Sequence, residues 1–223
     1  METHKPKSWH GPGEFFREYL IIVVGVLTAL GGEQAVEWMH RQNELAETRE
    51  ALREEIAQNG KLITLGVALD SCRVGITEKL ADWARGGPQP KKITPPSYAS
   101  LNFGVWDVAK SGPLSRMPVK ERLSYALAYD AFEKAQKVID RQGDASIGTL
   151  QYRNQEQLSP DQALRLLELS SALRALLEVG VGGKTALLNQ IQTLGISPEP
   201  ISDGEREALN ELCEVAGVPV PAL

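Results

Sequence analysis

Histidine is scarce in this chain of 223 residues, and its absence from most of the sequence excludes several chemistries. The three histidines are His4, His10 and His40, so none lies beyond residue 40. A Ser-His-Asp or Cys-His nucleophile and a histidine-containing metal site are therefore excluded from the main part of the chain. Neighbouring carboxylates such as Glu54 and Glu55 point apart on a helix. We therefore expect no enzyme activity, no cofactor and no metal site.

Positive charge and aromatic residues are scarce as well. The chain has 24 Lys and Arg against 29 Asp and Glu, a formal net charge of -5, and no basic run longer than Lys91-Lys92. Nucleic-acid phosphates are bound by basic faces, so a nucleic-acid partner is not expected. Aromatic residues make up 6% of the chain, and its apolar content comes mainly from Leu, Ala, Val and Ile set among Glu, Arg and Gln. This composition predicts an all-α fold.

One stretch has no charge at all, because fourteen uncharged residues separate Glu18 from Glu33. As a helix they would extend ~21 Å, which is less than the ~30 Å of a bilayer's hydrocarbon layer. The flanks lengthen the candidate span, since both sides carry aromatic residues of the kind found at membrane interfaces: Phe15, Phe16, Tyr19 and Trp38. We therefore predict a transmembrane anchor over residues 15–38, with the lipid bilayer as its partner.

Two other interpretations of this stretch remain open. Its short apolar core is compatible with the buried helix of a soluble protein. Ala29-Leu30-Gly31 places small residues after an apolar run, as a cleaved signal peptide does, although helical sequence continues past that position. The membrane anchor is preferred, because its aromatic flanks match both interfaces.

Small residues recur along the predicted anchor. Gly25, Ala29 and Gly32 follow one another at i, i+4 and i+7, a spacing that places them on one side of a helix. Such a stripe lets a second helix approach closely in lipid. It predicts association through the anchor, either as a homo-oligomer or with another membrane protein. Glu33 follows the stripe, where the headgroup region accommodates a carboxylate.

Beyond the anchor, Gly and Pro divide the sequence into helices. A charged helix over 39–60 has only a narrow apolar stripe and is predicted to be a stalk, with a bend at Asn59-Gly60. A stronger stripe follows, typical of a helix with one buried face: Leu62, Leu65, Leu69, Cys72, Ile76, Leu80 and Trp83. Gly86-Gly87 and Pro95-Pro96 then bound a surface loop.

Further helices are predicted from their start and stop signals. One begins at Pro118 and continues to residue 142. The next begins at Ser159-Pro160 and is interrupted by glycines over 180–183, and its predicted inward positions are Leu164, Leu167, Ser171 and Leu177. Ser202 and Glu205 form a capping box for a last helix that ends near Gly217.

Helices joined by short loops favour an antiparallel bundle. The predicted organisation is an N-terminal tail over 1–14, the transmembrane anchor over 15–38, the charged stalk over 39–60, the bundle domain over 61–217 and a C-terminal tail over 218–223. The fold class is therefore an N-terminal transmembrane helix that continues into a stalk and then into a helical bundle.

The segment VGVGGKTALL, residues 179–188, matches a phosphate-binding loop only in part. Gly183-Lys184-Thr185 precedes a helix, but Glu178 occupies the position where the motif requires glycine. The residues before it are predicted to be helical and not a strand, so backbone amides would not point at a phosphate. A glycine link between two helices is the preferred interpretation.

Three segments together resemble a known group of proteins: FFREYLIIVVGVLTALGGEQAVEW, the charged LAETREALREEI and the later WDVAKSGPLSRMP. The chain resembles an uncharacterised family of bacterial single-pass membrane proteins with a very short N-terminal tail, one apolar anchor helix and a helical extramembrane domain. The likeness covers residues 1–60 and, more loosely, the middle segment. It implies a topology and no activity.

The expected orientation follows partly from this resemblance. Basic residues on the two sides of the anchor are nearly balanced, with Lys5, Lys7 and Arg17 before it and Arg41, Arg49 and Arg53 after it. The resemblance, together with the prolines and cysteines of the main part, favours an N-terminus in the cytoplasm. The main domain is then periplasmic, and the anchor lies in the bacterial inner membrane.

In that oxidising compartment the two cysteines, Cys72 and Cys213, are expected to form a disulfide. Cys72 lies in an apolar stripe between Leu69 and Ile76, and Cys213 lies four residues after Leu209, so both cysteines are predicted to face inward. Two buried free thiols are the alternative, because the sequence contains no distance between the two helices.

Two functions are compatible with these features. The first is a membrane-tethered interaction or scaffold module. The alternative is a periplasmic ligand-sensing bundle that acts through a membrane partner, with a pocket lined by Trp83, Trp106, Tyr125 and Tyr129. Ordinary core packing is the preferred explanation of these aromatic residues, so the first function is preferred.

Overall fold

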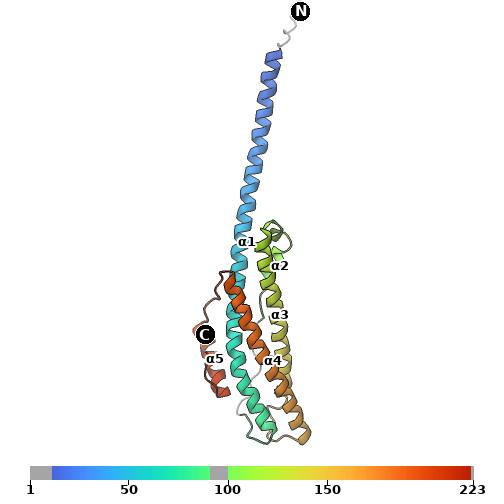
Figure 1. The fold of residues 1–223 in the computed structure, drawn as a ribbon, viewed down its shortest axis with the longest axis vertical. Helices are drawn as coiled ribbons and strands as arrows, with labels where there is room; N and C mark the ends of the chain where they lie inside the picture. The colour runs from blue at the N-terminus through green and yellow to red at the C-terminus, as the bar shows by residue number, and fades with distance from the viewer. Residues whose placement is uncertain (1–11, 91–99, 222–223) are drawn as a thin grey trace, which may run out of the picture. The chain divides into compact units, whose positions relative to one another are not determined.

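The structure, a computed structural model, describes residues 12–90 and 100–221 (Figure 1). These residues form no strand, and their helices are α1 (Pro12–Ala84), α2 (Gly104–Ala109), the 3-10 helix η1 (Pro113–Arg116), α3 (Val119–Leu150), α4 (Pro160–Thr193) and α5 (Asp203–Ala216). The all-α prediction is therefore confirmed. Most of the predicted N-terminal tail, the end of the predicted loop at Pro95-Pro96 and the last two residues lie outside the described residues.

Contacts between residues divide the chain into two compact units, Met1–Glu47 and Thr48–Leu223. In the first unit, the described residues form only the initial part of α1. Its large apolar side chains from Phe15 to Met39 are exposed, apart from the half-buried Val23. Among the described residues, one helix is long and apolar enough to cross a membrane, and none of its most apolar stretch is buried.

In the second unit, α1 lies beside α3 and α4, and α3 is antiparallel to α4 as predicted (Figure 1). α1 and α3 run parallel instead, because successive contacts advance along both helices in the same direction. Arg49 donates to Glu121, and further along Gln142 donates to Asp70. The long connection over 85–118 permits this arrangement, since it returns the chain to the starting end of the bundle.

The bundle begins earlier than the sequence predicts. Leu52, Ile56 and Asn59 belong to the predicted stalk, yet each is 0% exposed in the second unit. α1 also continues as a helix through Asn59-Gly60. A Cβ at Gly60 would come 3.2 Å from Pro198, so this glycine permits close packing of the segment that follows α4.

α4 differs from its prediction in two ways. The helix is continuous through 180–183, so the expected interruption is wrong. Its buried face is also rotated, because Leu164 and Ser171 are exposed while the buried positions are Leu166, Ser170, Leu173, Leu177, Gly180, Lys184, Leu187 and Ile191. Leucines lie on both sides of the first half of α4, and a lysine and a glycine lie on the buried face further along, which is why hydrophobicity alone placed this face incorrectly.

The start and end signals of the later helices are confirmed. Ser159 and Ser202 are N-caps, each in a capping box with the residue three positions later, Gln162 and Glu205. α5 ends at Gly217, whose φ of 72° is left-handed, a conformation that glycine adopts without steric cost. α3 begins where predicted and extends beyond its predicted end.

Candidate functional site

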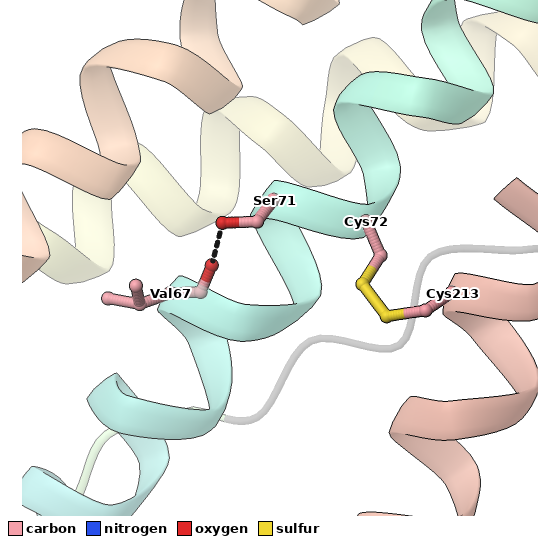
Figure 2. Close-up of a disulfide and its surroundings, with 4 residues drawn as sticks. All are labelled: Val67, Ser71, Cys72 and Cys213. Carbon is pink, nitrogen blue, oxygen red and sulfur yellow. Dashed lines mark hydrogen bonds between the residues drawn. A yellow bond between two sulfur atoms is a disulfide. The ribbon is translucent and has the colours of Figure 1, made fainter. Parts of the chain in front are cut away.

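The two cysteines meet between α1 and α5 (Figure 2). Cys72 and Cys213 form a disulfide with a Cα–Cα distance of 4.9 Å, and both are 0% exposed. The same two helices supply the apolar side chains around it, including Ala68, Leu209 and Ala216. The structure thus joins the pair that the sequence predicts, and the bond ties α5 to α1 across a sequence separation of 141 residues.

Polar contacts fasten both ends of α5 to α1. At its start, Lys61 Nζ lies 3.5 Å from Glu205 Oε1. Hydrogen bonds from the backbone and the hydroxyl of Ser202, and then the charge of Lys61, hold the pKa of Glu205 below its ordinary value. At its end, Lys79 Nζ donates to the carbonyl of Val215 at 2.7 Å and so satisfies a carbonyl of the last turn. α5 is therefore held at both ends as well as by the disulfide.

The predicted association stripe of the anchor has no contact that explains it within the described residues. Gly25, Ala29 and Gly32 are exposed, and a Cβ added at either glycine would meet nothing within 4 Å. Thr28, beside the stripe, donates its hydroxyl to the carbonyl of Val24 at 2.8 Å and is satisfied within its own helix. A role of the stripe in helix association stays a prediction.

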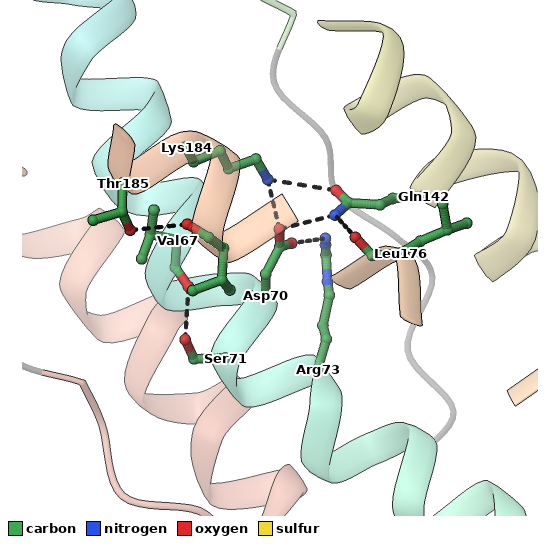
Figure 3. A network of polar contacts seen from close by, with 9 residues as sticks. Val67, Asp70, Ser71, Arg73, Gln142, Leu176, Lys184 and Thr185 are labelled. Carbon is green, nitrogen blue, oxygen red and sulfur yellow. Dashed lines mark hydrogen bonds and ion pairs between the residues drawn. The ribbon is translucent and has the colours of Figure 1, made fainter. Parts of the chain in front are cut away.

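A charged pair is buried in the bundle where α1, α3 and α4 meet (Figure 3). Asp70 on α1 is 0% exposed, Lys184 on α4 is 3% exposed, and Lys184 Nζ lies 2.6 Å from Asp70 Oδ2. Gln142 on α3 joins them, because its Nε2 donates to Asp70 Oδ2 at 3.0 Å and to the carbonyl of Leu176 at 3.1 Å. These side chains connect three helices at one level of the bundle.

The second oxygen of Asp70 faces another cation. Oδ1 has no hydrogen bond within the described residues, and it lies 3.8 Å from the guanidinium of Arg73. A buried charge is costly unless it is paired, so the loss of one member of this network should be worse than the loss of both charges. The network can therefore fix the relative positions of the three helices, a role for which no reacting molecule is needed.

Gly180 allows α4 to approach this network. A Cβ at Gly180 would overlap Gln142 Nε2 and come 3.1 Å from Asp70 Oδ2. Sequence reasoning missed the network because it placed Lys184 in a link between two helices. A signal was present on α1, where a second stripe at helical spacing includes Asp70 among positions that are all buried: Leu52, Ile56, Asn59, Ile63, Asp70 and Thr77.

A second buried carboxylate holds the short helix α2. Glu55 on α1 is 5% exposed, and it accepts hydrogen bonds from the backbone N–H groups of Val105 at 2.8 Å and Trp106 at 3.2 Å. It therefore caps α2, whose own N-cap residue makes no side-chain hydrogen bond. The hydroxyl of Tyr129 donates to the same carboxylate at 2.6 Å. Burial, and then the hydrogen bond and charge of Glu55, raise the pKa of Tyr129.

The segment before α2 is fastened by two side-chain amides. Asn59 Nδ2 donates to the carbonyl of Asn102 at 2.7 Å, and the Asn102 N–H donates to Asn59 Oδ1 at 2.8 Å. Gln136 Oε1 on α3 accepts a hydrogen bond from the Leu101 N–H at 2.9 Å. Backbone polar groups that would otherwise need water are thus bonded to α1 and α3.

The four aromatic residues predicted to line a pocket lie in different places. Trp83 belongs to an apolar cluster formed by the end of α1, the turn after α3 and the start of α4. Trp106 stacks on Tyr129, with ring centroids 4.5 Å apart and an interplanar angle of 10°. Tyr125 lies one turn before Tyr129 on α3. The structure therefore does not bring all four together around one cavity.

The described residues of the second unit form grooves between their helices, and two of these bear on the predicted pocket. One, of about 710 Å³, lies between the end of α1, residues 88–90 and α5. The other, of about 300 Å³, lies between α3 and α4. None of the four predicted aromatic residues lines either groove. Over 12–90 and 100–221, no group of three or more His, Cys, Asp or Glu residues is placed to hold a metal ion.

These features define a class of protein by structure alone. It is an all-α protein in which one helix is apolar enough to cross a membrane and a helical bundle is joined internally by buried polar groups. Comparisons with protein-family models, with curated proteins and with solved structures found no match for this chain.

Proposed function

We propose that the protein is a membrane-anchored scaffold module, in which α1 holds the chain in a bilayer and the bundle presents surfaces to other proteins. The observation that carries this proposal is the exposure of apolar side chains on the first part of α1. The exposed large side chains are Phe15, Phe16, Tyr19, Leu20, Ile21, Ile22, Val24, Val26, Leu27, Leu30, Val36, Trp38 and Met39. Their exposure to water is unfavourable, whereas a hydrocarbon layer solvates them and leaves helical backbone groups satisfied.

The bundle supports a scaffold role because its internal connections favour rigidity. Asp70, Lys184 and Gln142 link three helices, the disulfide holds α5, and Glu55 holds α2. These polar groups bind one another across helices. Lys184 also lines the groove between α3 and α4, but its ammonium is paired with Asp70, whereas a substrate site would need polar groups that are free to face the cavity. An interaction surface needs only a fixed arrangement of exposed side chains.

We further propose that the bundle is periplasmic, with the N-terminus in the cytoplasm and the anchor in a bacterial inner membrane. The pairing of Cys72 with Cys213 supports this orientation, because structural disulfides persist in oxidising compartments and the periplasm is one. The basic residues around the anchor are nearly balanced and favour neither orientation. Added protease should therefore degrade the bundle in spheroplasts whose inner membrane is intact, and protection of the bundle there would reverse the orientation.

Extraction with alkaline carbonate tests the anchor. The chain should stay in the membrane pellet, and Val24→Arg with Leu27→Arg should release it, because two charges near the centre of a span cost ~5–7 kcal/mol. The matched control is Ile147→Arg with Leu164→Arg, which alters comparably exposed apolar residues of the bundle and should leave the pellet unchanged. Release of the unaltered chain by carbonate would contradict the proposal.

Purification in mild detergent tests the scaffold role. A homo-oligomer or a stoichiometric membrane partner in the purified complex would support it. A monomer that carries a bound small molecule would instead support the alternative, a ligand-sensing bundle.

A further inference from the structure

One half of α4 differs from the other in charge. The first half carries exposed charged residues, which are Asp161, Arg165, Glu168, Arg174 and Glu178. Over 179–193 the charged residue is Lys184, and it is buried against Asp70. The exposed positions of this second half are therefore uncharged. Depletion of charge is characteristic of the centre of protein interfaces.

The uncharged half of α4 forms one wall of the groove of about 300 Å³ between α3 and α4. Small and apolar side chains line this groove, among them Ala131, Ala135, Val138, Val179, Gly183 and Ala186. Val179 is 68% exposed. Lys134 and Lys184 also line the groove. The ammonium of Lys134 lies 2.6 Å from Asp130 and that of Lys184 lies 2.6 Å from Asp70, so neither pair adds net charge. This groove, together with the exposed side of α4 over 179–193, is named the α3/α4 face.

Two glycines on the α3/α4 face are not explained by packing within the bundle. Gly182 and Gly183 lie inside α4, where glycine is less favourable than alanine. A Cβ added at either position would meet nothing within 4 Å, whereas a Cβ at Gly180 would overlap Gln142. Gly180 thus serves the packing of this chain, while Gly182 and Gly183 leave room for a close approach from outside it.

We propose that the α3/α4 face pairs with the same face of a second copy of this chain, an inference that rests on the proposed membrane anchoring. The lack of exposed net charge favours this occupant. Two copies of a charged face would bring like charges into contact, which is unfavourable, whereas two copies of this face do not. A different partner could instead complement a charged face. The anchor favours it too, since copies in one membrane share an orientation and a high effective concentration. Pairing of identical faces closes a dimer.

Thiol crosslinking of the full-length chain in membranes tests the pairing. Val179→Cys places a thiol on the groove, and Leu164→Cys is a matched control on the charged half of the same helix, with 60% exposure against 68%. The native cysteines are joined in a disulfide and do not react. A short bis-maleimide should give about tenfold more dimer with Val179→Cys than with the control. Equal yields would overturn the proposal.

A second substitution separates pairing from folding. Gly183→Glu introduces a charge at a position with room for a side chain, and glutamate is more favourable than glycine in a helix. On the Val179→Cys background it should lower the dimer yield about tenfold while circular dichroism shows the same helicity and an unchanged or higher Tm. The uncharged Gly183→Ala should lower the dimer yield less than Gly183→Glu, because it adds only a methyl group and no charge to the close approach. An unchanged yield with Gly183→Glu would overturn the proposal.

A reporter in the anchor distinguishes this inference from the scaffold proposal itself. Val36→Cys reports association of the anchors, independently of the bundle. Dimers from Val36→Cys without dimers from Val179→Cys would overturn the proposed pairing through the α3/α4 face and would remain compatible with the membrane-anchored scaffold. Dimers from Val179→Cys without dimers from Val36→Cys would support the face and place self-association in the bundle alone.

Discussion

The two parts of α1, before and after Thr48, place their side chains in opposite environments within one helix. Before Thr48, large apolar side chains such as Leu27 and Trp38 are exposed, and after it the polar side chains of Asn59 and Asp70 are fully buried. Exposed apolar residues require a solvent other than water, whereas buried polar residues require partners on neighbouring helices. Helix formation alone does not distinguish these environments, so the comparison must be tested through stability and association.

The largest effect is expected at the buried pair in the second part of α1. Lys184→Met leaves Asp70 buried without its closest cation and should lower the free energy of unfolding by about 3–5 kcal/mol. The double variant Asp70→Leu, Lys184→Met removes both charges and should recover most of that loss. Urea unfolding of the full chain in detergent measures both variants. A single variant as stable as the unaltered chain would contradict the buried pair.

The disulfide gives the next largest effect. Cys72→Ser with Cys213→Ser should lower the free energy of unfolding by about 2–5 kcal/mol, because the bond closes a long loop and restricts the unfolded chain. Alkylation before lysis, followed by mass spectrometry without reduction, tests whether the bond forms in the cell. Two alkylated cysteines would refute it and would also weaken the proposed periplasmic location.

The raised pKa of Tyr129 predicts that the bundle loses stability at alkaline pH. Its pKa is raised above the ordinary value of 10.0 by burial and by Glu55. The folded chain therefore keeps a proton that the unfolded chain loses, so this contribution is complete below about pH 10 and decreases as the pH rises further. Tyr129→Phe should remove part of that decrease and cost about 1.5–3 kcal/mol at neutral pH, since the hydrogen bond is made to a carboxylate.

Thermal unfolding between about pH 8 and pH 11 checks the Tyr129 prediction. Burial also raises the pKa of Tyr125, so Tyr125→Phe is the natural control for the alkaline loss that remains. Identical pH profiles for the unaltered chain and Tyr129→Phe would contradict the assigned role of the hydroxyl.

Two glycines on α4 sharpen the contrast between buried and exposed positions. Gly180→Ala should destabilise the bundle by about 1–3 kcal/mol, because the added Cβ overlaps Gln142. Gly183→Ala should stabilise it by about 0.5–1 kcal/mol, because nothing obstructs the methyl group and alanine favours the helix. Denaturant titrations should therefore show a lower free energy of unfolding for Gly180→Ala and a higher one for Gly183→Ala. A change in the same direction for both variants would contradict the described difference between their surroundings.

The smallest loss is expected in the first part of α1. Replacement of Gly25, Ala29 and Gly32 by Leu should weaken association of the anchors by about 1–2 kcal/mol, because close approach of two backbones is lost. The dimer yield from Val36→Cys measures this effect. Gly31→Leu, which changes an adjacent glycine outside the stripe, is the matched control, and an equal yield from both variants would contradict the stripe.

Local features of this fold were predictable because each depends on residues that are close in sequence. The capping boxes at Ser159 and Ser202 and the left-handed Gly217 are such features, and the structure contains all three. The pairing of Cys72 with Cys213 joins distant positions, but the chain has only two cysteines, so an intramolecular bond has one choice of partner. The inward side of α4 was not predictable in this way, since a buried lysine lies on it.

The sequence by itself determined most of the helices, the caps at Ser159 and Ser202 and the apolar segment, whereas tertiary structure alone decided which polar residues belong to the core. Lys184 meets Asp70 across 114 residues, and Glu55 caps a helix 50 residues further along the chain. The parallel arrangement of α1 and α3 depends in the same way on the path of a long connection. The physical reason is that a buried charge or a buried helix end is stable only beside a group that pairs with it or hydrogen-bonds to it. Such a group comes from a distant part of the chain and is brought close only by folding, so no local sequence pattern specifies it.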